Sequence, residues 1–306
     1  MNDTFPQRIP PSFARRIDWA DPRDPLLRQV ALSPEEFREV AGYSSDPLDE
    51  ASVSPVPGVL RKYRGRALLL VSRACPIHCR YCFRRHDRGE SAPRGLAEWT
   101  PALELLRGDG ELREVIYSGG DPLMRDDAFL AALTQRVEAM PQVRRLRIHT
   151  RMAVAVPERV TPTLTAWLGA SRLQPVMVVH VNHPRELDGE AVAALGRLAG
   201  AGVRLFNQSV LLAGVNDDAA VLAELSERLM AAQVTPYYLH QLDPVAGAAH
   251  FAVSDQRALG LMRHWRRSAP GYLIPRLVRE IPGAEGKVPL CDPEGEESAD
   301  ERRHFA

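Results

Sequence analysis

Residues 67–86 read ALLLVSRACPIHCRYCFRRH, a short apolar run followed by Cys75, Cys79 and Cys82. Three cysteines in a C-x3-C-x2-C arrangement can hold three irons of a 4Fe-4S cluster through their thiolates and leave the fourth iron without a protein ligand. The sequence supplies no nearby fourth cysteine. An open metal position is typical of catalysis, because it can bind a substrate or a cofactor. The stretch therefore predicts a buried strand that leads into a catalytic iron–sulfur loop.

A structural zinc site, completed by His78 or His86, is the alternative for these cysteines. Structural zinc motifs usually combine two ligand pairs that are separated by a longer loop. Here the three cysteines lie within one short loop, so the spacing favours an iron–sulfur cluster over zinc.

From Ala67 onward, short apolar runs alternate with longer amphipathic stretches. The apolar runs predict strands over 67–71, 114–118, 145–149, 176–180, 203–206 and 236–240. The amphipathic stretches predict helices over 126–139, 162–169, 188–201, 217–232 and 254–267, with Asp126, Asp188 and Asp217 as N-caps. Strands recur about every thirty residues, the size of a βα unit. We therefore expect an α/β fold, a partial (β/α)6 barrel with its functional groups at the C-terminal ends of the strands.

Composition divides the chain into four parts. Residues 1–62 are rich in Pro, Arg and Asp, which predicts an N-terminal extension of short helices and loops packed against the main body. Residues 63–253 contain the predicted barrel, and residues 254–293 form a C-terminal segment that includes Lys287. Residues 294–306 are polar, and we expect them to form a disordered tail.

The chain has 306 residues, 45% of them apolar, which is enough to bury a large core. Its 39 basic and 39 acidic residues cancel, so no net field favours nucleic acid or an anionic membrane surface. The N-terminus lacks a basic segment followed by an apolar core, and no run of about 18 apolar residues follows. Three clustered cysteines and the isolated Cys291 form no disulfide framework. We expect a cytoplasmic protein with a small-molecule partner, and no role is assigned to Cys291.

Polar groups follow several predicted strands at their C-terminal ends. Ser118, Gly119 and Gly120 end one strand, His180 ends another and Gln208 follows a third. Paired glycines let the backbone approach a ligand closely, although an ordinary strand-exit turn also contains them. Isolated His and Gln residues are more often satisfied polar groups. Their common position at one rim of the barrel favours a binding site.

Lys62 and Lys287 are the only lysines among the 39 basic residues. Lys287 lies in a glycine-containing stretch, where a solvated loop lysine is the simple alternative. A lysine amine can form a Schiff base with pyridoxal phosphate, whereas a guanidinium stays protonated. Asp243 and Glu280 are either surface carboxylates or, if they face one cavity, an anionic pocket for a substrate ammonium.

These motifs together resemble the radical SAM superfamily and, within it, the lysine 2,3-aminomutase family. The resemblance extends from about Asp21 to Pro289 and is closest to the short members that work with elongation factor P. It rests on four motifs, at residues 75–86 (CPIHCRYCFRRH), 118–123 (SGGDPL), 207–212 (NQSVLL) and 236–240 (PYYLH).

The resemblance implies which residues bind the cofactors. Cys75, Cys79 and Cys82 match the ligands of a 4Fe-4S cluster whose open iron binds S-adenosylmethionine. The residues that match contacts to S-adenosylmethionine are Ser118, Gly119, Gly120, His180 and Gln208. Lys287 matches the lysine that binds pyridoxal phosphate, and Tyr63 and Arg66 match residues near that cofactor.

The substrate residues are implied in the same way. Arg84 matches an arginine that pairs with the substrate carboxylate, and Asp243 and Glu280 match an acidic pair that holds the distal ammonium of lysine. The longer members carry Asp where this chain has Glu280. They also carry a cysteine for an intersubunit zinc, where this chain reads Asn216-Asp217-Asp218, so we do not expect that metal.

The resemblance implies an isomerase that converts α-lysine to β-lysine, with L-lysine as substrate, an electron donor, and a functional link to elongation factor P and its ligase. One alternative is a radical SAM aminomutase for another amino acid such as glutamate. The acidic pair argues against glutamate, because it would repel a distal carboxylate. A non-catalytic iron–sulfur or zinc regulatory protein is the other alternative.

Overall fold

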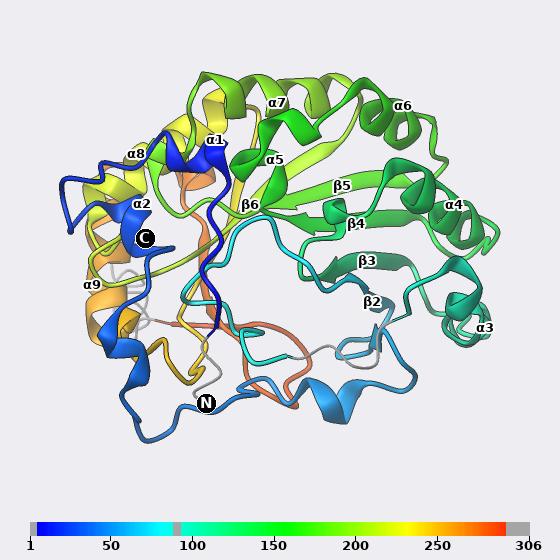
Figure 1. The fold of residues 1–306 in the computed structure, drawn as a ribbon, viewed down its shortest axis with the longest axis horizontal. Coiled ribbons are helices and arrows are strands. Elements are labelled where there is room, and N and C mark those ends of the chain that lie inside the picture. Colours follow the sequence, from blue (N-terminus) through cyan, green and yellow to red (C-terminus); the bar gives the residue numbers. More distant parts are fainter. Residues whose placement is uncertain (1–4, 88–92, 292–306) are drawn as a thin grey trace, which may run out of the picture.

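A computed structural model describes residues 5–87 and 93–291 and contains one open, nine-stranded sheet (Figure 1). The strands lie in sequence order, and the seven from β2 to β8 are parallel. β1 and β9 add short antiparallel edges. The strands are β1 (Val59–Leu60), β2 (Arg66–Ser72), β3 (Glu114–Gly119), β4 (Arg145–Thr150), β5 (Gln174–Val179), β6 (Arg204–Val210), β7 (Thr235–His240), β8 (Arg276–Arg279) and β9 (Val288–Pro289).

Helices form an outer layer around the curved sheet (Figure 1). The helices of this layer are α3 (Thr100–Arg107), α4 (Asp127–Glu138), α6 (Pro162–Ala170), α7 (Gly189–Gly200), α8 (Ala219–Ala231) and α9 (Asp255–Arg266). Three shorter helices lie outside it: α1 (Pro11–Ala14) and α2 (Pro25–Arg28) in the N-terminal extension, and α5 (Met152–Ala155) after β4. Alternate strand residues, such as Leu69 and Val115, pack with helix residues such as Leu133 and Leu195 in the main apolar core. The opposite face of each strand is turned away from the helices and toward the inside of the partial barrel.

The six predicted strands and the five predicted helices are confirmed, and neighbouring predicted strands pair as expected. The prediction of Asp217 as an N-cap is wrong. Asp218 caps α8 and accepts hydrogen bonds from the N–H groups of Ala220 and Val221. Asp217 accepts from the Gly214 N–H at 2.7 Å and so stabilises the preceding turn. Two adjacent aspartates carry the same capping chemistry, and only the path of the chain decides which one caps the helix.

Two elements have no clear pattern in the sequence. α3 has eight residues with Pro at its start, and β8 has four residues, two of them arginines. Both are too short for their periodicity to stand out. β8 matters for the site, because it brings the segment with Glu280 and Lys287 beside β7.

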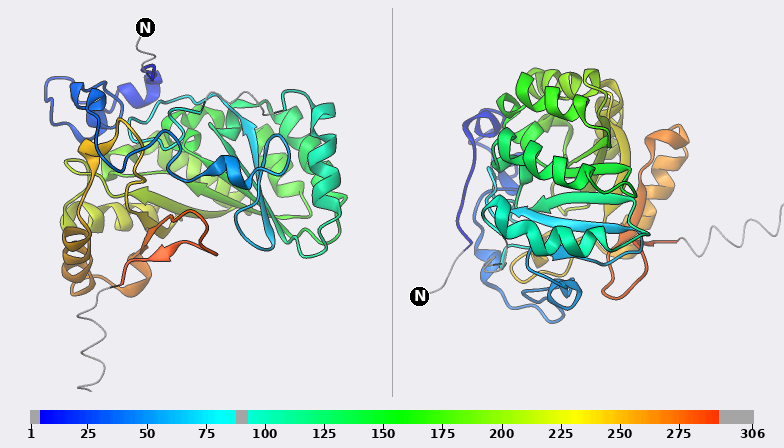
Figure 2. Two further views of the ribbon diagram at one scale, coloured as in Figure 1. Left: turned by 90° about the horizontal axis from the view of Figure 1, so that it is seen from below. Right: turned by 90° about the vertical axis from the view of Figure 1, so that its right-hand side faces the viewer.

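The N-terminal extension lies along the barrel (Figure 2) and packs against it through a small apolar cluster. Phe13 and Leu26 of the extension pack with Ile77 of the cysteine loop and Ala155 of α5. The extension thus touches the predicted cluster loop directly. The predicted tail, residues 294–306, lies outside the described residues. No helix within the described ranges has the length and apolar character that crossing a membrane requires.

Candidate active site

Alternation along the strands gathers the predicted site residues on the inner face of the barrel. On β3, Val115 and Tyr117 belong to the helix-side core, so Ser118 has the opposite orientation. On β6, Gln208 likewise points to the inner face, where it lies beside Tyr238 of β7. The residues that share the inner face are Arg66, Ser118, His149, His180, Gln208, Tyr238, His240 and Glu280.

The three cysteines of the loop after β2 are free and half-buried. Burial raises the pKa of Cys75, and Asp121 and the thiolates of Cys82 and Cys79 raise it further. Burial, followed by Cys79, raises the pKa of Cys82 to about 11. Negative charge on neighbouring sulfurs thus disfavours the thiolates of Cys75 and Cys82, and iron bound to the three sulfurs would relieve that repulsion. This arrangement fits an iron–sulfur cluster.

The two histidines of the zinc alternative are engaged by other segments. His78 Nδ1 lies 2.8 Å from the carbonyl oxygen of Pro6, and His86 Nε2 lies 2.9 Å from that of Ala246. Among the described residues, no group of three or more His, Cys, Asp or Glu side chains surrounds a single metal position. The ligands of a 4Fe-4S cluster bind separate irons, so a cluster does not require such a position.

Gly119 and Gly120 let the backbone of the turn after β3 pack directly against the start of the cysteine loop. A Cβ atom on Gly119 would lie 2.1 Å from the carbonyl oxygen of Ser72, and the φ of Gly119 is +122°. A Cβ atom on Gly120 would lie 2.5 Å from the carbonyl oxygen of Ala74. The Gly120 N–H donates to Ser72 O at 2.7 Å. Only glycine permits this close approach, which explains the paired glycines of the sequence.

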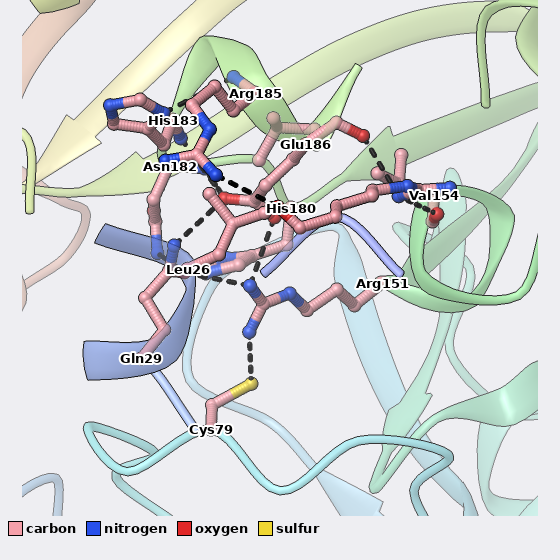
Figure 3. A network of polar contacts seen from close by, with 12 residues as sticks. Leu26, Gln29, Cys79, Arg151, Val154, His180, Asn182, His183, Arg185 and Glu186 are labelled. Atoms are coloured by element: carbon pink, nitrogen blue, oxygen red, sulfur yellow. Dashed lines mark hydrogen bonds and ion pairs between the residues drawn. The ribbon is translucent and has the colours of Figure 1, made fainter. Parts of the chain in front are cut away.

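A buried network around Arg151 lies behind the cysteine loop (Figure 3). Arg151 Nη1 donates to Cys79 Sγ at 2.8 Å and to the Tyr81 hydroxyl at 2.9 Å. His180 Nε2 lies 2.9 Å from the same hydroxyl, and its ring stacks on Tyr81. Burial, with a smaller effect of Arg151, lowers the pKa of His180 to about 3. His180 is therefore a neutral hydrogen-bonding group beside the cysteine loop.

Lys287, in the segment after β8, contacts a cluster of acidic and aromatic side chains. Its Nζ donates to Glu280 Oε2 at 2.6 Å and lies 5.5 Å from the centre of the Tyr238 ring. The Tyr63 hydroxyl donates to Glu280 Oε1, and the Arg66 guanidinium lies 4.8 Å above the Tyr63 ring. The structure thus brings Tyr63 and Arg66, which precede the cysteine loop, beside Glu280 and Lys287 near the other end of the described chain.

Asp243 belongs to the same cluster of side chains. Burial raises its pKa to about 7; Lys287 opposes this shift and Glu280 adds to it. The pKa of Glu280 is lowered because Lys287 and Tyr63 outweigh the opposing effect of burial. Lys287 thus pairs directly with Glu280, and both charges act on Asp243. An anionic pocket made by Asp243 and Glu280 for a substrate ammonium stays a prediction.

Arg84 lies in the cysteine loop, two residues after Cys82, and contacts the N-terminal extension and the turn after β3. Its Nε and Nη2 donate to the two carboxylate oxygens of Glu50 at 2.7 and 2.8 Å. Its Nη1 donates to Ser118 Oγ at 3.2 Å and Gly119 O at 3.1 Å. Lys62 Nζ lies 3.5 Å from the same glutamate. A substrate carboxylate that binds Arg84 must therefore share the guanidinium with Glu50 or displace Glu50 from it.

Sequence reasoning missed several residues of this site. Glu50 comes from the extension, where no pattern marks it, and only its place after a predicted strand marks Arg151 in the sequence. His149 and His240 lie on the inner face with buried Nε2 atoms that have no hydrogen-bond partner among the described residues. Burial, with a smaller contribution from nearby cations, lowers the pKa of both. Alternation of apolar and polar residues along the strands would have placed His149 and His240 on the inner face from the sequence alone.

Comparisons with known proteins agree with this geometry. Residues 69–161 match the Radical SAM superfamily. Among solved structures, a radical SAM methyltransferase from Sphaerobacter thermophilus is similar in fold, with a TM-score of 0.50, 21% identity and coverage of 75% of this chain and 72% of that one. The fold and the cysteine loop are therefore those of a radical SAM enzyme.

Sequence relatives define the family more narrowly. L-lysine 2,3-aminomutase of Escherichia coli (strain K12) is 48% identical over 286 residues, which cover 94% of this chain and 83% of the relative. The protein of the same name from Haemophilus influenzae is 45% identical over 284 residues, with coverage of 93% and 84%. That from Clostridium subterminale is 37% identical and is covered over 68% of its length. This chain belongs to the lysine 2,3-aminomutase family.

Proposed function

We propose that this enzyme converts α-lysine to β-lysine, with a 4Fe-4S cluster, S-adenosylmethionine and pyridoxal phosphate as cofactors. The observation that carries the proposal is the pocket of Lys287, Glu280 and Asp243 on the inner face of a barrel that also carries the cysteine loop. When bound, the cluster and S-adenosylmethionine supply the radical, and pyridoxal phosphate supplies the group that delocalises electrons during migration of the amino group.

Each proposed cofactor residue has a role that suits its surroundings. Cys75, Cys79 and Cys82 would bind the cluster, and the residues proposed to contact S-adenosylmethionine are Ser118, Gly119, Gly120, His180 and Gln208. Lys287 would hold pyridoxal phosphate through its amine. Tyr63 and Arg66, stacked on one another beside Glu280, would contact the same cofactor.

Contacts of Glu280 support lysine as the substrate. Glu280 already binds one ammonium group, that of Lys287. The distal ammonium of a lysine substrate would bring a matching positive charge to Glu280 and Asp243. A glutamate substrate would bring a further negative charge into the pocket. Arg84 would bind the substrate carboxylate at the opposite end.

We also propose that the enzyme acts in the cytoplasm, takes single electrons from a separate donor, and supplies β-lysine for modification of elongation factor P by its ligase. The motif resemblance to short family members supports the link to elongation factor P. The balanced charge gives no reason to expect nucleic acid or a membrane surface as a partner.

Anaerobic assay of the reconstituted protein with α-lysine, a low-potential reductant and S-adenosylmethionine tests the reaction. We expect β-lysine from the wild type and none from Lys287→Ala, although iron loading stays normal. Lys287→Arg is the matched control for charge, because it can still pair with Glu280 but cannot form a Schiff base. It should be equally inactive.

Turnover by either variant at the wild-type rate would remove Lys287 from the mechanism. Cleavage of S-adenosylmethionine without β-lysine, or faster conversion of glutamate, would contradict lysine as the substrate. Addition of elongation factor P and its ligase to the finished reaction tests the proposed link. We expect attachment of the β-lysine product in preference to α-lysine, and the reverse preference would refute the link.

A further inference from the structure

Arg151 makes a direct contact with one of the three cysteines. Its Nη1 donates to Cys79 Sγ at 2.8 Å (Figure 3). Arg151 follows β4, whereas Cys79 lies in the loop after β2, so the contact is a product of the fold. The arginine side chain is 6% exposed and stays charged in this position.

Two acceptors hold the other end of the guanidinium. Arg151 Nη2 donates to Gln29 Oε1 at 2.7 Å and to Glu186 Oε2 at 3.0 Å. Glu186 is fully buried and is itself fixed by the N–H groups of Asn182 and His183. The guanidinium therefore cannot turn away from Cys79 without leaving Glu186 as an unpaired buried charge.

Apolar side chains surround Cys79 on two sides. It packs against the core of the N-terminal extension, which includes Ile77 and Leu26, and against a second cluster that includes Leu212 and Phe251. Little water can screen the charge of Arg151 from a group bound at this sulfur. The electrostatic effect of the arginine is thus stronger than at an exposed cysteine.

We propose that Arg151 is a positioning residue that raises the reduction potential of the cluster through Cys79. The cluster accepts one electron from an external one-electron donor, no proton moves, and the site becomes more negative by one charge. A cation and hydrogen-bond donor at a cluster thiolate stabilises the reduced state more than the oxidised state. The inference rests on the proposed function for the presence of the cluster.

Glu186 opposes this effect, because its negative charge lies in the same network. The donor nitrogen of Arg151 touches the sulfur, however, while Glu186 touches the far nitrogen of the same guanidinium. The pair therefore turns its positive end toward Cys79. We expect the net effect of the pair on the potential to be an increase, smaller than that of an isolated arginine.

Redox titration followed by electron paramagnetic resonance tests the proposal on reconstituted protein without lysine. We expect Arg151→Met to have a more negative midpoint potential than the wild type, and Arg151→Lys to lie between them. The double variant Arg151→Met/Glu186→Gln keeps the site neutral. It should also lie below the wild type, by less than Arg151→Met.

Arg16→Met is the matched control. Arg16 is 5% exposed and pairs with Asp188 and with the carbonyl oxygen of Glu186, so it belongs to the edge of the same network. The cluster of the Arg16→Met variant should have the same midpoint potential as that of the wild type. A wild-type potential in Arg151→Met, or an equal shift in Arg16→Met, overturns the proposal.

If Arg151→Met binds no iron, the test rests on the double variant Arg151→Met/Glu186→Gln. A midpoint potential in the double variant equal to that of the wild type overturns the proposal. Failure of this proposal and failure of the proposed function are distinguishable. If the midpoint potentials of the variants shift as expected but the wild type makes no β-lysine, only the proposed function is contradicted. A protein that makes β-lysine with the same potential in every variant contradicts only the role of Arg151.

Discussion

Asp243 has a pKa of about 7, because burial disfavours its charged form and Lys287 only partly offsets this. Between its ordinary value of 3.8 and about 7, the folded protein holds a proton that the unfolded chain has lost. Stability is therefore lost as the pH rises through this range. Near pH 8, we expect the free energy of unfolding of Asp243→Asn to exceed that of the wild type by about 1–3 kcal/mol, with a higher melting temperature. Near pH 4, the two proteins should unfold at the same temperature.

The same substitution separates stability from substrate binding. Only ionised Asp243 attracts an ammonium, so wild-type kcat/KM for lysine should fall as the pH drops below about 7. Asp243→Asn should show a raised KM without this limb of the pH profile. A wild-type KM in the variant would remove Asp243 from the substrate pocket.

At the scale of elements, the turn after β3 joins two loops of the site. Gly119 has a positive φ, and an added Cβ would overlap the carbonyl oxygen of Ser72. We expect Gly119→Ala to destabilise the fold by at least about 1–3 kcal/mol, the cost of the strained φ alone. Thermal unfolding measures the loss, and the iron content should fall with it because the cysteine loop is displaced.

Gly196→Ala is the control for this prediction. Gly196 lies within α7, and nothing lies within 4 Å of an added Cβ. Alanine is the better helix former by up to about 1 kcal/mol, so this variant should unfold at a higher temperature. Opposite signs for the two substitutions are the expected result. Equal melting temperatures would mean that the turn adapts to a side chain.

Periodicity predicted the long elements but not the short ones. Long strands and helices such as β5 and α7 carry enough repeats of their pattern to be recognised. β8, with four residues, depends on pairing with β7 for its conformation. Because β8 positions Glu280, the pattern of predicted strands alone did not place Glu280 and Lys287 beside β7.

At the scale of the whole molecule, buried charges tie the N-terminal extension to the barrel. Glu36 of the extension is 2% exposed at its side chain and binds Arg80 and Arg85 of the cysteine loop. Burial would raise the pKa of Glu36, but hydrogen bonds from these arginines lower it. We expect Glu36→Gln to destabilise the protein by about 3–5 kcal/mol in urea unfolding, because two buried cations lose their counter-charge.

Glu35→Gln is the control, because Glu35 and Glu36 are neighbours in one short 3-10 helix, Pro34–Phe37. Glu35 pairs with Arg38 at 2.7 Å on the surface, where an ion pair contributes about 0–1 kcal/mol. A similar loss in both variants would show that the extension is held by its apolar core and not by the buried ion pairs.

The sequence by itself determined the cluster loop, the alternation of strands and helices, and the position of polar groups after the strands. These follow from local spacing, because thiolate ligands, βα units and glycine turns each occupy a short stretch of chain. Lys287 also stands out in the sequence, since lysine is rare in this chain. Those features needed no knowledge of distant contacts.

Only the tertiary structure decided the partners of these groups. Arg84 meets Glu50, Cys79 meets Arg151, and Lys287 meets Tyr63 through Glu280. Each set joins residues from separate elements, and the acceptor of a buried charge is fixed by which surfaces pack together. Local sequence carries no record of that choice, so the electrostatics of the site became visible only in the folded chain.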